Sequence, residues 1–242
     1  MPPILSFVIG IFSQANNHQI KVHDCLIKAA GNVTGIAVNE DGSGADREHY
    51  NLKVWGCDVG LSAYLSAATT GASLFRNIEC YNNDYAVLLT DSISCTFKNV
   101  SGHSSLFDDW LRTGAGQGTL QNCADSDDSI NTQGFNDTNT VPNIVPANEY
   151  SSLDETNSNF LKIVPVSQLY KAGISVESGF DIQGWPRPKA TGEYAIGSHE
   201  LASGPGIYDL NSEDIQANPK EGIGPLGTQF TNIPVAIDTE TT

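Results

Sequence analysis

The sequence Leu74-Phe75-Arg76-Asn77-Ile78-Glu79-Cys80 returns in altered form twice further along the chain, around Asn99 and Asn122. Each copy has an apolar residue two positions before the asparagine and another directly after it. The three asparagines are separated by 22 and 23 residues. A repeat of that length, holding only short strand-like runs, cannot bury an apolar face alone and must stack on its neighbours. The sequence therefore predicts an all-β, solenoid-like fold.

The asparagine itself predicts a bend. The two apolar positions of each copy lie three residues apart, and a straight strand would expose one of them. A bend lets both point inward, and asparagine tolerates the left-handed backbone that such a bend needs. Stacked repeats would align these amides in a column in which each bonds the next. Upstream copies are expected in residues 51–57, with Lys53 at the bend, and in residues 20–25.

Bulk composition limits the possible partners. The 242 residues fit one large domain, or one domain with an extension. A net charge of -16, spread along the chain, argues against nucleic acid and anionic membranes as partners. The five cysteines are interpreted as small buried hydrophobic residues. Cys25 and Cys57 are expected in one column, where a disulfide is the alternative, and no cysteine spacing suggests zinc.

The N-terminal apolar run, residues 4–12, has two interpretations. It resembles the core of a secretory signal, followed by small residues at 13–15, but no Lys or Arg precedes it. We favour a first buried strand. Nine residues are too few to span a bilayer as a helix, so no membrane insertion is predicted.

Three regions follow from the composition. Residues 1–131 are predicted to form parallel coils of two or three short strands each. Residues 132–200 are expected to be a loop-rich capping region, in which 133–140 form a polar loop and scattered prolines exclude long helices and central strands. Residues 201–242 are expected to be an extended acidic arm that contacts a partner or the side of the stack.

A motif near the end of the second region resembles a known family. Residues 181–188, Asp-Ile-Gln-Gly-Trp-Pro-Arg-Pro, and residues 194–200, Tyr-Ala-Ile-Gly-Ser-His-Glu, resemble the closing motif of right-handed parallel β-helix proteins of the pectin-lyase-like kind. Ser198 replaces the usual alanine, and Ala195 replaces the usual acidic residue. The resemblance implies that fold for roughly residues 20–200. It also assigns a structural role to these residues: Asp181, Gly184, Pro186, Arg187, Gly197 and Glu200.

The chemistry of this motif predicts a cap on the last coil. Arg187 can form a bidentate contact with a carboxylate, for which Asp181 and Glu200 are the candidates. The large apolar side chain of Trp185 would cover an exposed coil edge.

The best local candidates for catalysis are Asp108 and Asp109, together with His103 and Arg112. Paired carboxylates about 5 to 10 Å apart serve glycoside hydrolysis. The resemblance implies catalytic blocks in another order, however, and the basic residue that lyases of the family use is missing. For Asp108 and Asp109 the structural alternative is a solvated loop before Trp110. Asp125, Asp127 and Asp128 are the candidate calcium ligands, and no cofactor is expected.

The sequence thus favours a non-catalytic structural protein of a virion or a cell surface, which assembles with other protein subunits through its coil ends and its C-terminal arm. The resemblance makes a homo-oligomer, such as a trimer, the expected form. The alternative is a β-helix that binds or degrades polysaccharides, with glycans as ligands. A secreted adhesin fragment is a third option. All three place the protein on a virion or outside the cell.

Overall fold

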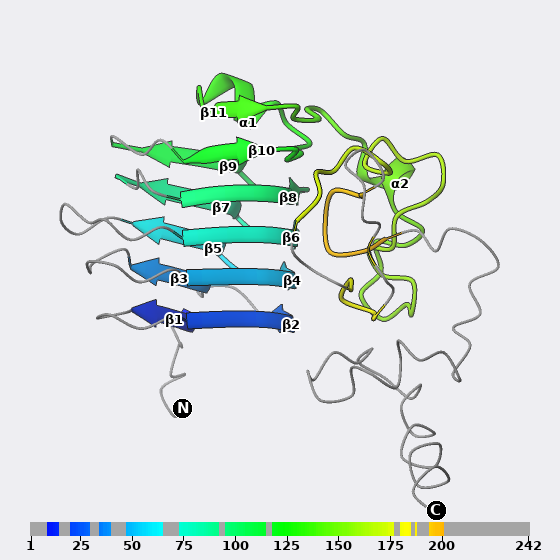
Figure 1. Cartoon of the computed structure of the whole chain (residues 1–242), viewed down its shortest axis with the longest axis horizontal. Coiled ribbons are helices and arrows are strands. Elements are labelled where there is room, and N and C mark those ends of the chain that lie inside the picture. The colour runs from blue at the N-terminus through cyan, green and yellow to red at the C-terminus, as the bar shows by residue number, and fades with distance from the viewer. Residues whose placement is uncertain are drawn as a thin grey trace, which may run out of the picture.

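The computed structural model describes residues 9–14, 20–29, 34–39, 47–64, 73–91, 95–114, 118–176, 180–184, 187 and 194–200. In these residues the fold is all-β, with two parallel sheets whose strands alternate along the chain (Figure 1). No helix among the described residues has the length and apolarity needed to cross a membrane.

From β1 to β10, consecutive strands belong to different sheets, so each strand pairs with the strand two earlier in the chain, whereas β11 pairs with β10. Sheet A has the order β1 (Ile9–Gln14), β3 (Thr34–Asn39), β5 (Val59–Tyr64), β7 (Tyr85–Thr90) and β9 (Asp108–Thr113). Sheet B has the order β2 (Ile20–Lys28), β4 (Arg47–Trp55), β6 (Ser73–Tyr81), β8 (Cys95–His103), β10 (Thr119–Gln121) and β11 (Asn136–Thr138).

The long strands of sheet B bend at their middle residue. Asn77 of β6 has φ 56° and Asn99 of β8 has φ 54°, both in the left-handed region. The apolar residues on either side of each bend, such as Phe75 and Ile78, are fully buried. The predicted bend and its inward-pointing neighbours are therefore confirmed at these asparagines.

The predicted bend at Lys53 is wrong. In β4 the left-handed residue is Asn51, with φ 52°, and Asp24 takes that place in β2 with φ 53°. Lys53 lies opposite Glu79, two positions after the bend, so its side chain is on the outer face of the sheet. The error arose because His49, rather than an apolar residue, precedes Asn51 by two positions.

The space between the two sheets holds the main apolar core. Its largest fully buried side chains include Phe75, Phe97 and Trp110. Phe75 stacks on Phe97 with ring centroids 4.8 Å apart. The cysteines are free thiols, so the Cys25–Cys57 disulfide alternative is wrong. Cys25 pairs in register with Leu52 instead, and the two cysteines do not share a column.

The C-terminal end of the stack is covered by short elements. Helix α1 (Ser129–Thr132) packs on β9, and β11 continues sheet B beyond β10. Ile130 of α1 is fully buried. Residues 133–140, predicted to be a loop, therefore include a strand, because β10 leaves an edge to which Asn136–Thr138 can pair.

The described part of residues 141–200, which we call the strap, lies beside the carboxyl ends of β4, β6 and β8 (Figure 1). It contains the short helix α2 (Pro146–Glu149) and otherwise isolated bridges and turns. The strap forms a second apolar cluster, centred on Tyr150, Leu161 and Ile196, against which Trp55 and Tyr81 of sheet B pack. Sheet B is thus covered on both faces near these strand ends.

Candidate functional site

A buried polar cluster lies between the outer face of sheet B and the strap. Its centre is the Glu79 carboxylate of β6, which is fully buried. The Tyr150 hydroxyl donates to Glu79 Oε1, and His103 Nε2 lies 3.1 Å from the same oxygen. The backbone N–H of Ser198 lies 3.4 Å from the other oxygen. Donors from sheet B and from two distant parts of the strap therefore converge on one carboxylate.

Further contacts order the aromatic and hydroxyl groups around Glu79. The His103 ring stacks on the Tyr150 ring with centroids 4.7 Å apart. Ser101 Oγ lies 3.2 Å from Tyr150 Oη and can donate to it. Burial raises the pKa of Tyr150 well above its ordinary value, and the adjacent Glu79 charge adds to this effect. Tyr150 therefore stays protonated and acts as a hydrogen-bond donor over the physiological range.

Lys53 supplies a cation one strand away from Glu79. Its ammonium group donates to the Phe160 carbonyl oxygen in the strap and lies 5.2 Å from the Phe160 ring centroid. Burial lowers the pKa of Lys53 to about 7, against the opposing pull of the Glu79 charge. An amine with this pKa can serve as a base, but Lys53 is only 6% exposed.

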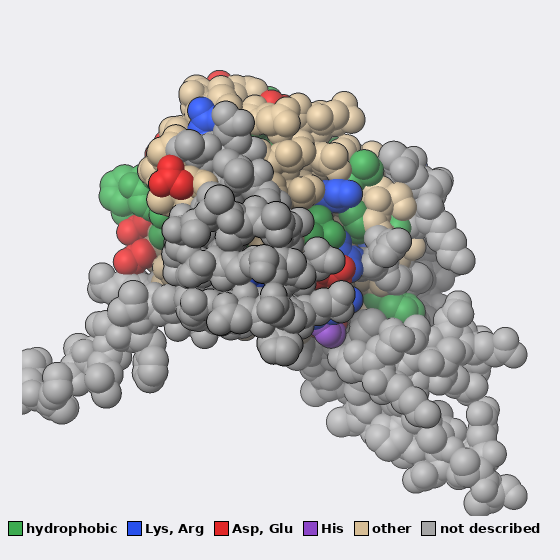
Figure 2. Space-filling view, turned by 60° about the vertical axis from the view of Figure 1, so that its left-hand side comes forward, with side chains coloured by type: hydrophobic (Ala, Val, Ile, Leu, Met, Phe, Trp, Pro, Cys, Tyr) green, Lys and Arg blue, Asp and Glu red, His purple; other side chains and the backbone are tan. Residues whose placement is uncertain are grey.

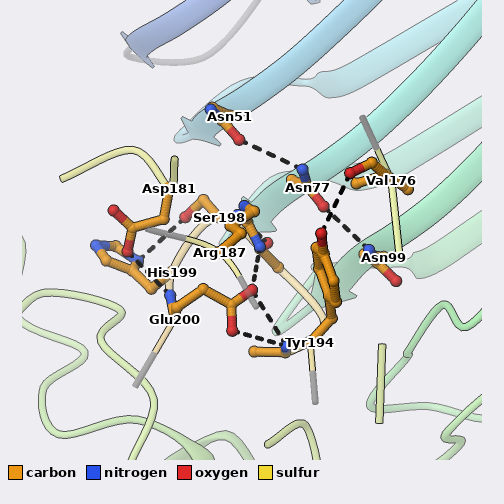
Figure 3. Close-up of polar contacts among 12 residues, drawn as sticks. Asn51, Asn77, Asn99, Val176, Asp181, Arg187, Tyr194, Ser198, His199 and Glu200 are labelled. Carbon is orange, nitrogen blue, oxygen red and sulfur yellow. Dashed lines mark hydrogen bonds and ion pairs between the residues drawn. The ribbon is translucent and has the colours of Figure 1, made fainter. Parts of the chain in front are cut away.

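The asparagine column, of which Figure 3 shows Asn51, Asn77 and Asn99, also holds the strap. Asn99 Nδ2 lies 3.0 Å from Asn77 Oδ1, and Asn77 Nδ2 lies 3.5 Å from Asn51 Oδ1, so the predicted bonding between amides is confirmed for these three asparagines. The same Asn99 amide donates to Ile174 O at 2.8 Å and accepts from Ile174 N at 2.7 Å. Asn122 and Asn51 donate to strap carbonyls in the same way, at Ala172 and Phe180. The column therefore pairs with an extended return segment as well as with itself.

The closing motif packs directly on this column and on Glu79. Gly197 has φ 104°, and its N–H donates to the Asn99 carbonyl oxygen at 2.9 Å. A Cβ at this position would lie 2.2 Å from Glu79 Oε2. Glycine is therefore required here both by the left-handed backbone and by the close approach of the carboxylate.

The predicted pairing of Arg187 with a carboxylate is confirmed for Glu200, but through one nitrogen rather than as the predicted bidentate contact (Figure 3). Arg187 Nη1 pairs with Glu200 Oε1, and its Nη2 donates to the Gly197 carbonyl oxygen at 3.3 Å. Asp181 accepts the Glu200 backbone N–H at 2.9 Å. Gly184 has φ 81° and closes a turn by donating to Asp181 O at 3.0 Å. Trp185 and Pro186 lie outside the described residues.

Two titratable groups of the motif are held away from water. Burial raises the pKa of Glu200 to about 7, although Arg187 lowers it in opposition. Burial lowers the pKa of His199 well below its ordinary value, and the nearby Lys53 charge acts in the same direction. His199 is therefore buried as a neutral ring, with its Nδ1 3.2 Å from Ser198 Oγ.

Asp109 does not form an exposed acidic pair with Asp108. Both lie in β9 rather than in a solvated loop, and Asp109 is 1% exposed. Its carboxylate accepts the backbone N–H of Ser126 at 2.7 Å and of Ser105 at 3.1 Å, and also the Ser126 hydroxyl. Burial raises the pKa of Asp109 against the lowering effect of these bonds. Asp109 thus ties β9 to the segment that covers it.

Arg112 and His103, the other two catalytic candidates, make their contacts in two different parts of the fold. Arg112 donates to the Gly134 carbonyl oxygen at 3.0 Å, at the covered end of the stack. His103 belongs to the Glu79 cluster instead. On the face shown in Figure 2, the described acidic and basic side chains lie in small separate groups.

Asp125 and Asp127 of the proposed calcium set bind backbone groups. Asp125 is fully buried and accepts N–H groups of Ile130 at 2.7 Å and Asn143 at 3.0 Å. Asp127 accepts the Asp109 N–H at 2.9 Å. Asp128 has φ 63° and accepts the Asn131 amide at 2.6 Å. No group of three or more potential metal ligands occurs among the described residues.

The Glu79 cluster was missed in the sequence because its members are far apart along the chain. Glu79 and Tyr150 are separated by 71 residues, and no local motif links them. One signal was available: Lys53, Glu79 and Ser101 share the outward position two residues after the bend. Charged residues recurring at one outward position predict a polar cover over that face.

Comparison with known proteins finds no match for this chain. No protein-family model, no curated protein and no solved structure matches it.

Proposed function

We propose that the two parallel sheets are faces of a right-handed parallel β-helix. We further propose that the protein is a non-catalytic structural component of a virion or a cell surface. The alternation of strands between sheets and the bonded asparagine column support the fold. The contacts of Gly197, Arg187 and Glu200 support a structural role for the closing motif.

The burial of the Glu79 cluster is the observation that carries the functional proposal. Glu79 and His103 are 0% exposed, and Lys53 is 6% exposed. Apart from His103 Nδ1, which has no hydrogen-bond partner among the described residues, their polar atoms bind the strap or each other. A substrate could reach them only if the strap left sheet B. Buried charges satisfied in this way fix the position of a covering segment.

The proposed structural role includes assembly with other subunits through the coil ends and the arm of residues 201–242. Deleting this arm should leave the two sheets folded, as followed by circular dichroism, and abolish the native assembly, as measured by light scattering after size exclusion. Normal assembly of the truncated chain would contradict the role of the arm.

The competing function, polysaccharide degradation, is tested by incubating the full chain with a panel of acidic and neutral polysaccharides. We expect neither new reducing ends nor unsaturated sugars. Release of either product, lost in Asp108→Ala or in Glu79→Gln, would contradict the proposal. Asp108 is the appropriate first variant because, unlike Asp109, its replacement removes no buried contact described above.

A further inference from the structure

The N-terminal end of the stack is open among the described residues. There, β1 pairs only with β3, and β2 pairs only with β4. The inner residues of β2, Val22, Cys25 and Ile27, stay partly exposed, whereas their register partners in β4 are fully buried. A parallel edge with apolar side chains beside it is a site for another strand.

The sequence holds one more copy of the bend frame, in the region after the strap. Phe230-Thr231-Asn232-Ile233 matches Phe75-Arg76-Asn77-Ile78 and Phe97-Lys98-Asn99-Val100 at every defined position. Residues 228–236 place Asn232 in the middle of nine residues, as in β6 and β8. We propose that residues 228–236 of this chain add to the open edge of β2 as a further parallel strand.

The register of such a strand would complete the open core. With Asn232 opposite Asp24, Phe230 falls opposite Val22, and Ile233 falls opposite Cys25. Asp24 already accepts the Asn51 amide at 3.0 Å. As a carboxylate it only accepts, and the Asn232 amide offers the donor it can still bind.

Pro234 fits residues 228–236 to the N-terminal end of the stack and not to a position between two strands. After the bend, residues whose side chains point outward direct their backbone N–H and C=O groups toward the preceding strand of sheet B. For example, the Trp55 carbonyl oxygen of β4 accepts from the N–H of Ala29, which follows β2, and the Ala124 N–H donates to the Val100 carbonyl oxygen of β8. Pro234, two positions after Asn232, takes the same place. Below β2 its nitrogen would point away from the sheet, and no hydrogen bond would be lost. Proline is accepted in strands only at such edges.

The chain is long enough to reach its own β2. Twenty-seven residues separate Glu200 from Thr228, and a flexible linker of that length spans about 30 Å on average. Near the end of the closing motif, Ser198 lies beside Glu79 of β6, about three strand spacings or roughly 15 Å from the position below β2. Binding within one chain is favoured because the linker keeps the segment at high effective concentration.

Cys25 provides the readout, because it is the one cysteine that is not buried. Alkylation of Cys25 should be about tenfold faster or more when residues 225–242 are deleted, since protection scales with the closed population. Phe230→Asp and Ile233→Asp should accelerate it similarly, and Thr231→Asp, at an outward position, should not. A synthetic peptide of residues 226–238 should slow the reaction again in the truncated chain.

Two results would overturn the proposal. Equal Cys25 rates in the full and truncated chains would mean that the segment leaves the edge open. Protection that disappears on dilution, together with the loss of an oligomer in light scattering, would mean that a second copy donates the strand. Either result leaves the proposed structural function standing, because that function is tested with polysaccharides and assembly instead.

Discussion

The two faces of sheet B are both buried, but different kinds of contact bury them. The inner face packs Phe75, Phe97 and their neighbours against sheet A in an apolar core. The outer face, after the bend, carries Lys53, Glu79 and Ser101, and the strap satisfies each of them. Apolar packing tolerates small changes of shape, whereas a buried carboxylate requires every donor in place. Substitutions on the outer face should therefore be the more damaging ones.

The largest effect is expected from Gly197→Ala. The left-handed φ of 104° and the 2.2 Å approach of Glu79 Oε2 together should cost about 4 kcal/mol of unfolding free energy. Gly134→Ala is the matched control, since Gly134 has φ 66° and its nearest neighbour beyond the chain is Arg112 Nη2 at 3.8 Å. It should cost about 1 kcal/mol, from backbone strain alone. Urea unfolding measures both, and equal losses would contradict the close contact.

Replacing Glu79 by methionine should cost about 3 kcal/mol, because Tyr150, His103 and the Ser198 N–H would lose a shared acceptor. Glu79→Gln keeps one oxygen and should cost less. Glu48→Gln is the control: its carboxylate also pairs with cations on sheet B, but its side chain is 28% exposed, so the change should stay within about 0.5 kcal/mol. A Glu79→Met variant as stable as the Glu48→Gln control would contradict a stabilising role for the Glu79 cluster.

Asn99→Ala should cost about 2 kcal/mol, because it removes contacts to Asn77 and to both backbone groups of Ile174. Asn122→Ala, at the end of the column, should cost about half as much, since among the described residues its side-chain amide makes one bond, to Ala172 O. Asn143→Ala controls for the left-handed backbone, because Asn143 has φ 57° and is exposed. Thermal unfolding of the three variants should rank them in this order, and the reverse order would argue against the column as the anchor of the strap.

The inner face also carries buried polar residues, and replacing one of them, His49, should sharpen the contrast. Its two ring nitrogens are buried and have no hydrogen-bond partner in the part of the chain that the structure describes, and the ring stacks on Phe75 with centroids 5.0 Å apart. Burial, with the Arg47 charge as a second cause, lowers the pKa of His49 to about 4. His49→Phe should stabilise the fold by about 1 kcal/mol at neutral pH.

The pH dependence of His49 follows from the sign of that shift. The unfolded ring binds a proton near pH 6.5 and the folded ring only near 4, so stability is lost as the pH falls through this window. Unfolding curves between pH 7 and 4 should therefore be flatter for His49→Phe than for the parent chain. Parallel curves would mean that His49 titrates normally.

The fold could be predicted from the sequence where a residue type recurs for a single physical reason. Asparagine at a left-handed bend, with apolar residues at fixed offsets, predicts the inner face correctly at Asn77 and Asn99. It misleads at Lys53, because His49 breaks the apolar pattern there. The outer face could not be predicted in the same way. Its contacts join Glu79 to Tyr150 and Ser198, and such distant partners leave no periodic trace.

The candidate site residues likewise divide into a pair that local sequence predicts and carboxylates whose partners it does not predict. Arg187 and Glu200 lie 13 residues apart within one motif, and their pairing was predictable from their chemistry. The sequence makes Asp109 a catalytic candidate or part of a solvated loop, and Asp125 a candidate calcium ligand. It does not reveal that covering segments bring backbone N–H groups to both carboxylates.

The most direct test of the account is hydrogen exchange of two strap amides, those of Ile174 and Gly197. They donate to the side chain and to the carbonyl oxygen of Asn99. A strap fixed permanently on sheet B predicts that both exchange as slowly as the amides of β6 and β8. If both exchange at the rate of an open chain while the strands stay protected, the outer face is uncovered in solution and the structural role of Glu79 is contradicted.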